Sequence, residues 1–466
     1  MNLSFFRGLP LKALLLPLAG FTSSVMQGPK PDPQVIAQFG LLDNSNLQSF
    51  IDDKGQRMVQ VSDRPGNYGF TIVDSPVINA FATPDGHVYF TRGIMAHFNS
   101  EAQFAGVLGH ELGHITARHG QSQQRRSTAA GIGLLLGSIV APRVTQAVGG
   151  IAQQGLGVLF LKYGRDDERE ADQLGVKYST KIGYDASHMA DFFQTLQRNE
   201  QQSGGSSVPT FLSSHPNSGD RYKTVKNLAA QARQQTGGTL AVNRDQYLRA
   251  IDGLAYGNDP RQGFVEGGAF YHPELKFQFP VPQGWKHQNS PDKFQMAEPN
   301  GKAMLVLMAG GGSSLEDAAQ SLAKQMSLQG AQAQKTTINS FPAIAIQGDQ
   351  PAQQGQQGGA RVLAHLIQDG QTIYALVGLT SPSAYSTYAT TFSRVAQGFQ
   401  RLTDASKLNR QPERIRIKAA AGATSLAQAL SAAGVPAARH EELAILNGMQ
   451  RNDRLSPGQL YKVVAR

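Results

Sequence analysis

The chain has 466 residues, no cysteine and a formal net charge of +9 at pH 7. This length predicts about three domains, and the absence of cysteine excludes disulfide scaffolds, thiol catalysis and metal sites built on cysteine. The positive charge is spread along the chain without a run of five like charges, and no RNA-binding motif is present. The composition therefore predicts a globular protein without a nucleic-acid partner.

The first residues predict export. Arg7 and Lys12 precede a short apolar run from Ala13 to Phe21, which is shorter than the roughly 18 residues that a membrane span needs. A basic start followed by a short apolar run is typical of a signal peptide, here residues 1–27. Because Phe21 stands where a lipoprotein would have cysteine, we expect a periplasmic or envelope-associated bacterial protein without a lipid anchor. The alternative to a signal peptide is a buried or interfacial helix at the N-terminus.

Residues 28–240 contain the elements of a first, mainly helical domain. Strands are predicted within residues 70–92, with a turn at residues 83–86. A helix is predicted to begin after Ser100, which has capping-box spacing with Gln103, and to end near residues 118–120. The apolar residues 129–161 are either a buried helical hairpin or a flap that faces a membrane. Further helices are predicted over residues 166–197, broken at Gly183, and over residues 221–235.

Strand patterns dominate from about residue 264 onward. Strands are predicted near residues 275–281, 304–308, 343–346, 362–367 and 372–377, with helices at 314–329 and 385–399 and a hairpin loop at 353–359. These elements predict an α+β domain over residues 262–402. A linker follows, and residues 412–466 form a small third domain.

The sequence HELGH at residues 110–114 carries the strongest chemical signal. Residues four apart share one face of a helix, so the imidazoles of His110 and His114 can converge on one metal ion. Glu111 lies one step round the helix and can accept a proton from metal-bound water. The alternative is a surface helix that carries two histidines by chance.

A catalytic zinc ion needs a third protein ligand and an open position for water. Glu168 and Asp172 are four residues apart and share a helix face. One carboxylate can bind the zinc while the other holds a ligand histidine through its second nitrogen. Glu170 is the rival ligand, about 200° round the helix from Glu168. His119 is predicted to lie at the surface, and one Zn²⁺ is expected per chain.

The order of these motifs resembles a known family. Residues 79–87 (NAFATPDGH), residues 91–93 (TRG), HELGH and EREAD at 168–172 resemble the BepA/HtpX/Oma-type zinc metallopeptidases, which are gluzincins of peptidase family M forty-eight. The resemblance covers about residues 60–235 and implies a zincin-type fold with a small edge-strand sheet. It implies these roles: His110, His114 and Glu168 as ligands, Glu111 as general base, and Asp172 as support for a ligand.

The same resemblance places His215 near the zinc, as a stabiliser of the transition state or a reversible fourth ligand. Either His215 or Arg221 would steady the developing oxyanion, and the alternative for His215 is a loop histidine in solvent. The edge strand of the family corresponds to residues 87–91 here, where an extended polypeptide could add by strand pairing. Substrates are therefore expected to be polypeptides bound in extended form.

The two C-terminal domains carry weaker resemblances. Residues 277–399 resemble a PsbP/Mog-type α/β sandwich domain. Residues 412–466 resemble a degenerate LysM module, in which Ala423 stands where the module usually has aspartate. The alternative for this segment is a stabilising or substrate-presenting module.

Together these features predict an exported zinc endopeptidase that hydrolyses extended or misfolded proteins, with a role in envelope protein quality control. The alternatives are a catalytically silent chaperone or binding module, and an adaptor tethered to the cell wall. Two further candidate partners of the protein are a membrane surface and peptidoglycan.

Overall fold

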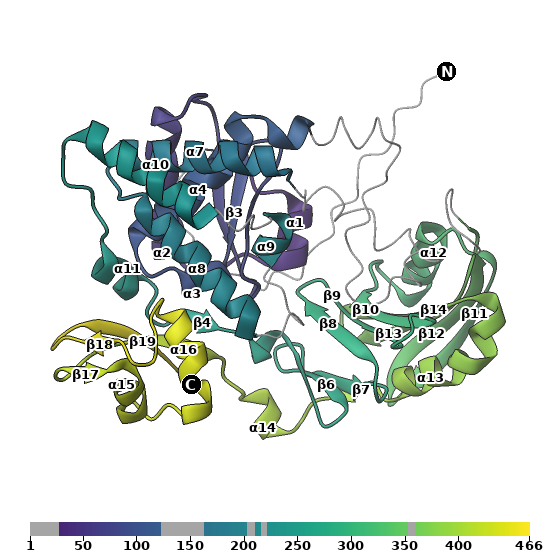
Figure 1. Cartoon of the computed structure of the whole chain (residues 1–466). Helices are drawn as coiled ribbons and strands as arrows, with labels where there is room; N and C mark the ends of the chain where they lie inside the picture. Colours follow the sequence, from purple (N-terminus) through teal and green to yellow (C-terminus); the bar gives the residue numbers. More distant parts are fainter. Residues whose placement is uncertain (1–27, 123–162, 203–209, 216–220, 353–358) are drawn as a thin grey trace, which may run out of the picture.

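A computed structural model describes residues 28–122, 163–202, 210–215, 221–352 and 359–466. The expected signal peptide, the apolar residues 129–161 and the loop residues 353–358 lie outside the described residues. Within the described part of the chain, no helix is long and apolar enough to cross a membrane. Figure 1 shows a mainly helical region in purple to teal, a sheet-rich region in green, and a yellow C-terminal segment beside the helical region.

The helical region contains a small three-stranded sheet. Its strands β1 (Gly69–Val73), β2 (Ala80–Ala82) and β3 (His87–Thr91) lie in the order β1-β3-β2. The predicted turn between β2 and β3 contains Gly86 with a φ of 96°. The expectation that residues 87–91 form the edge strand is wrong, because β3 pairs with β1 on one side and with β2 on the other. The edge strands of this sheet are β1 and β2.

Helix α4 (Glu101–Thr116) carries the HELGH motif. The Ser100 side chain accepts a hydrogen bond from the Gln103 backbone N–H at 3.2 Å, and the Gln103 side chain accepts one from the Asn99 backbone N–H at 2.7 Å. The predicted cap is therefore confirmed, with the return bond one residue earlier than a capping box would place it. The helix ends at Thr116, and the chain turns through Arg118 with a φ of 60°.

Helix α7 (Arg165–Lys181) packs very closely against α4. A methyl group added to Gly109 of α4 would lie 2.8 Å from the carbonyl oxygen of Gly175 on α7. A methyl group added to Gly175 would lie 3.0 Å from the His110 backbone nitrogen. The two glycines thus allow a backbone-to-backbone approach that any other residue would prevent. This approach brings the carboxylates of α7 to the histidines of α4.

The remaining helices of this region surround α4, α7 and the sheet. The predicted break at Gly183 is confirmed by its φ of 95° between α7 and α8. The helices are α1 (Pro33–Phe39), α2 (Ser45–Val61), α3 (Arg92–His97), α8 (Ser187–Gln202), α9 (Thr210–Ser214), α10 (Arg221–Thr236) and α11 (Arg244–Ala250).

The sheet-rich region is built on a seven-stranded antiparallel sheet in the order β11-β12-β13-β14-β10-β9-β8. Alternate residues of β10 (Ala303–Ala309) enter two separate cores, one with Val306 and helix α12 (Leu315–Gln325), the other with Leu305 and helix α13 (Tyr385–Gln397). The helices therefore cover opposite faces of the sheet, as expected for an α/β sandwich. The other long strands are β8 (Lys286–Ser290), β9 (Lys293–Ala297), β11 (Gln329–Ile338), β12 (Phe341–Gln350), β13 (Ala360–Asp369) and β14 (Thr372–Thr380).

Three strands of this sheet, β8, β9 and β11, were not expected from the sequence. The helix predicted over residues 314–329 ends at Gln325, and β11 begins at Gln329. All residues of β11 except Ile338 are exposed. Because neither face of β11 is buried before Ile338, its sequence lacks the apolar alternation that identifies a strand.

A smaller sheet packs onto the core that α13 shares with the large sheet. It has the order β15-β7-β6-β5. Its strands are β5 (Phe264–Glu266), β6 (Ala269–His272), β7 (Phe277–Pro280) and β15 (Gln400–Arg401), with short helical turns at η1 (Pro260–Gln262) and η2 (Pro382–Ala384).

The C-terminal segment packs into the helical region. Its strands β16 (Glu413–Ala419) and β19 (Leu460–Ala465) form one sheet with β4 (Ala255–Tyr256), which belongs to the earlier part of the chain. Apolar residues of both parts share one core cluster. Lys462 is fully buried, and its Nζ donates to the carbonyl oxygens of Ala96 and Phe98, each at 2.9 Å. The other elements are α14 (Ala405–Leu408), β17 (Thr424–Ser425), α15 (Leu426–Ala432), η3 (Ala437–Arg439), α16 (His440–Leu446) and β18 (Arg454–Leu455).

Candidate metal centre

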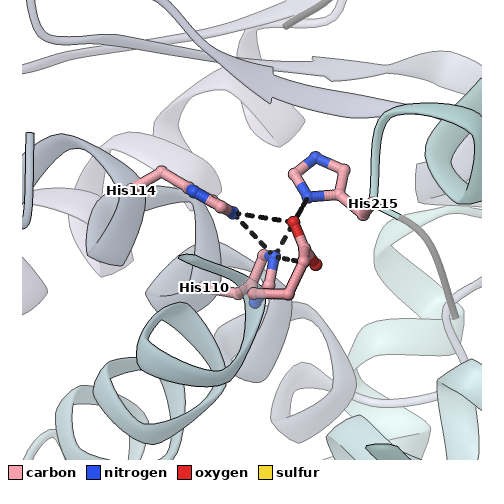
Figure 2. Close-up of side chains that lie close together, drawn as sticks. His110, His114 and His215 are labelled. Atoms are coloured by element: carbon pink, nitrogen blue, oxygen red, sulfur yellow. Dashed lines mark hydrogen bonds and ion pairs between the residues drawn. The ribbon is translucent and has the colours of Figure 1, made fainter. Parts of the chain in front are cut away.

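Four side chains that can bind a metal converge between α4, α7 and the end of α9. They are His110, His114, Glu168 and His215, each no more than 2% exposed. One ligand atom of each lies within 4.8 Å of the corresponding atoms of the others. Figure 2 shows the three imidazoles pointing toward one another. The structure thus brings together all of the metal-ligating residues expected from the sequence, with His215 beside them.

The distances within the cluster are short. The Nε2 atoms of His110 and His114 lie 3.1 Å apart. Glu168 places its Oε2 atom 3.6 Å from His110 Nε2 and its Oε1 atom 3.5 Å from His114 Nε2. The rival Glu170 points away, and its side chain is 60% exposed. The helix crossing therefore selects Glu168 over Glu170.

Asp172 and Arg221 form a charged layer behind the ligands. The Asp172 carboxylate lies 3.0 Å from His110 Nδ1 and accepts hydrogen bonds from Arg221 at 2.8 and 2.6 Å. Arg221 Nη1 also lies 2.9 Å from Glu168 Oε2. Burial alone would raise the pKa of Asp172, but Arg221 and His110 outweigh it and lower that pKa. The Arg221 guanidinium is therefore bound to the two carboxylates.

The protonation of the cluster fits a zinc ion. Because an ionised carboxylate only accepts hydrogen bonds, we assign a hydrogen to His110 Nδ1, which leaves Nε2 as the atom that faces the other ligands. Burial lowers the pKa of His114 well below its ordinary value, so this imidazole is neutral. Burial would raise the pKa of Glu168, but His215 and His114 outweigh it and hold that pKa well below its ordinary value. Two imidazoles and one carboxylate are the donor set of many catalytic zinc sites.

Glu111 lies beside this donor set and is fully buried. Neither of its carboxylate oxygens has a hydrogen-bond partner among the described residues. The nearest charged partner is His215, whose Nε2 lies 3.5 Å from Glu111 Oε1. Burial raises the pKa of Glu111, and His215 and His110 oppose this rise. A buried carboxylate without a hydrogen-bond partner is costly unless another group occupies the site.

The expectation that His119 lies at the surface is wrong. Its side chain is 5% exposed, and its Nδ1 lies 2.9 Å from His114 Nδ1. Its Nε2 lies 3.2 Å from Glu170 Oε2. The reason is the left-handed turn at Arg118, which folds the chain back toward the last turn of α4. Helical periodicity continued past the end of α4 cannot anticipate this reversal.

Tyr163 was missed by the sequence reasoning. Its ring stacks on His114, with ring centres 3.7 Å apart and an angle of 22° between the planes. A cleft opens beside these two rings and is lined by Ala82, Thr83 and Arg118, among others. The cleft therefore links the candidate ligand His114 with the end of the edge strand β2. No local pattern marks Tyr163, because it precedes α7 and meets α4 only in the folded chain.

Comparison with known proteins identifies this region. The model of peptidase family M48 matches residues 44–229. Residues 44–229 form a peptidase family M48 domain. The M48 domain thus contains all of the candidate ligands, Glu111, Asp172, His119 and Arg221, and the resemblance drawn from HELGH and EREAD is confirmed.

Two relatives illustrate the extent of the match. The beta-barrel assembly-enhancing protease of Yersinia pestis is 29% identical over 213 residues, which are 43% of this chain and 42% of that protein. The mitochondrial metalloendopeptidase OMA1 of Arabidopsis thaliana is 32% identical over 155 residues, which are 33% of this chain and 30% of that protein. The chain therefore spans less than half the length of these curated relatives.

Two solved structures each match about 30% of this chain. Cyanobacterial PsbP from Synechocystis is 14% identical and covers 30% of this chain and 98% of its own, with a TM-score of 0.24. The Ran-binding protein Mog1p of Saccharomyces cerevisiae is 10% identical and covers 31% of this chain and 99% of its own, with a TM-score of 0.23.

Proposed function

We propose that this protein is a zinc-dependent endopeptidase whose active site is the cluster on α4 and α7. The observation that carries the proposal is the position of Glu111. Its carboxylate is buried without a hydrogen-bond partner among the described residues, next to two imidazoles and a carboxylate that face one point. A polar group left in this way has a use in binding or chemistry more often than in stability.

The residues of the cluster divide the chemistry among them. His110, His114 and Glu168 would hold the zinc ion. Zinc bound in such a site supplies Lewis-acid chemistry, which acidifies water and polarises the peptide carbonyl. Glu111 accepts the proton of the attacking water and then delivers it to the leaving amine nitrogen. Burial raises the pKa of Glu111, which is the direction that makes a carboxylate a better proton acceptor.

His215 is proposed as a cap on the site, and Arg221 as a positioning residue. His215 Nδ1 lies 3.0 Å from Glu168 Oε1 and 3.2 Å from His110 Nε2, so His215 would supply a fourth ligand to a zinc ion held by His110, His114 and Glu168. Arg221 contacts the carboxylates of Asp172 and Glu168 and would orient both of them. X-ray absorption of the zinc-loaded protein should show one fewer nitrogen ligand in His215→Ala. An unchanged number of nitrogen ligands would show that His215 does not bind the zinc ion.

Substrates are proposed to be extended polypeptides that add to the edge strand β2. The end of β2 lines the cleft beside His114 and Tyr163, so a strand paired with β2 would lead toward the cluster. Main-chain pairing recognises little sequence, which favours unfolded or misfolded proteins as substrates. We expect β-casein to be cleaved and the same mass of a tightly folded protein to be left intact.

A role in protein quality control of the bacterial envelope is proposed on two grounds. Residues 1–27 have the pattern of a signal peptide, and a relative bears the name beta-barrel assembly-enhancing protease. Expression of the full chain in a bacterium, with mass spectrometry of the mature N-terminus in the periplasmic fraction, tests export. A chain that keeps its first residues in the cytoplasm would refute it.

The central experiment compares metal content and proteolysis in the full chain. Wild-type protein should contain one zinc ion and digest casein until a chelator is added. Glu111→Gln should keep the zinc and lower kcat by at least about 10²–10⁴-fold. Glu316→Gln is the matched control, because Glu316 is half exposed on α12 in the sheet-rich region. Undiminished proteolysis by Glu111→Gln would remove Glu111 from the reaction.

A further inference from the structure

The second nitrogen of His114 contacts another histidine, in contrast to the carboxylate that contacts His110. His114 Nδ1 lies 2.9 Å from His119 Nδ1, and His119 Nε2 lies 3.2 Å from Glu170 Oε2. His114 and His119 are nearly inaccessible to solvent, whereas the Glu170 side chain is 60% exposed. A row of three groups thus runs from the candidate metal centre to the protein surface.

The carboxylate at the outer end fixes the hydrogens along this row. Because a carboxylate oxygen accepts hydrogen bonds, we assign the hydrogen of this contact to His119 Nε2. In that tautomer His119 has its lone pair on Nδ1, so His114 Nδ1 donates to His119. This assignment leaves the lone pair of His114 on Nε2, the atom that faces His110 and Glu168.

The backbone holds His119 in this position. The Arg118 φ of 60° reverses the chain directly after α4, and the Arg118 N–H donates to the Ile115 carbonyl at 3.0 Å. The face of the His114 ring is stacked on the ring of Tyr163. The ring of His114 is therefore restrained both in tautomer and in orientation.

We propose that His119 is a positioning residue for the metal, which sets the tautomer and ring orientation of His114 and is itself oriented by Glu170. This inference rests on the proposed zinc site and extends it to a pair of residues outside the donor set. His110 is oriented directly by the carboxylate of Asp172. His114 is instead oriented by the imidazole of His119, which in turn contacts the exposed carboxylate of Glu170. Partners that orient a metal ligand typically change metal affinity by about 10–100-fold when removed.

The test measures zinc affinity of the full chain by competition with a chromogenic chelator. His119→Phe keeps a ring of similar size but cannot accept from His114, so its zinc dissociation constant should rise by about 10–100-fold. His119→Gln can accept through its carbonyl oxygen and donate to Glu170, so it should recover most of the affinity. Glu170→Gln should weaken zinc binding by only about 2–5-fold, because solvent can replace an exposed partner.

Two further measurements separate positioning from packing. Co²⁺-substituted His119→Phe should show a shifted d–d absorption spectrum, which a loss of packing elsewhere would not produce. His365→Phe is the matched control, since His365 is a buried histidine on β13 of the sheet-rich region, and its zinc affinity should equal that of the wild type. Wild-type zinc affinity in His119→Phe, or equal losses in the Phe and Gln variants, would overturn the inference. A wild-type protein that binds no zinc would instead overturn the proposed function.

Discussion

Gly109 offers a sharp test of how the helix crossing controls the metal centre. Glycine inside a helix is less favourable than alanine by about 1 kcal/mol, so helix propensity alone predicts that Gly109→Ala stabilises the protein. The structure predicts the opposite. The added methyl carbon would lie 2.8 Å from the Gly175 carbonyl oxygen and 3.0 Å from its Cα.

The size of the effect follows from these contacts. Ordinary contacts of a methyl carbon begin near 3.4 Å, so α7 must move away from α4 by about 0.6 Å. Overpacking of this kind costs about 1–3 kcal/mol, which offsets or exceeds the gain in propensity. Glu168 and Asp172 move with α7, and metal–ligand distances tolerate only about 0.2 Å of error. Zinc affinity should therefore fall further than stability, by at least about tenfold.

The assay combines urea unfolding of the zinc-free protein with chelator competition for zinc. Gly113→Ala is the graded control, because its methyl carbon would lie 3.1 Å from the Leu174 Cβ and 3.3 Å from Ala171, with the same gain in propensity. We expect a smaller loss of zinc affinity in Gly113→Ala than in Gly109→Ala. A Gly109→Ala protein that is more stable by about 1 kcal/mol and binds zinc like the wild type would refute the reasoning.

Three other expectations follow from buried charges. Asp172→Asn should lower zinc affinity by about 10–100-fold and the free energy of unfolding by up to about 3 kcal/mol, because Arg221 loses one of its two carboxylate partners. An unchanged calorimetric unfolding curve and an unchanged chelator titration would contradict this. Lys462→Met should lower the free energy of unfolding in urea by about 2–3 kcal/mol, because the carbonyl oxygens of Ala96 and Phe98 lose their donor. An unshifted urea midpoint would show that the C-terminal segment does not depend on this contact. Burial lowers the pKa of His97 to about 4, so the unfolded chain binds the extra proton between pH 6.5 and 4, and the free energy of unfolding should fall across that window by up to about 3 kcal/mol. His97→Gln should flatten this acid limb, and an equally steep limb in the variant would assign the loss to other groups.

The sequence by itself determined the chemistry that lies within a helical turn. The spacing of His110 and His114, the cap at Ser100 and the pairing of Glu168 with Asp172 are local properties, because helix periodicity and capping involve residues no more than four apart. The resemblance to family M48 rested on the same short motifs. For this reason the sequence anticipated two pairs, His110 with His114 and Glu168 with Asp172, each on its own helix. The two pairs are 54 residues apart at the nearest (168 − 114), so periodicity could not show how they meet.

The tertiary structure decided how those pairs meet. Periodicity allowed either Glu168 or Glu170 to face the histidines, and the close crossing of α4 and α7 at Gly109 and Gly175 chose Glu168. The burial of His119, the central place of β3 and the exposed strand β11 were likewise not predicted. Each depends on a chain reversal or on strand pairing between distant residues, and contacts of that kind leave no periodic signal in the sequence.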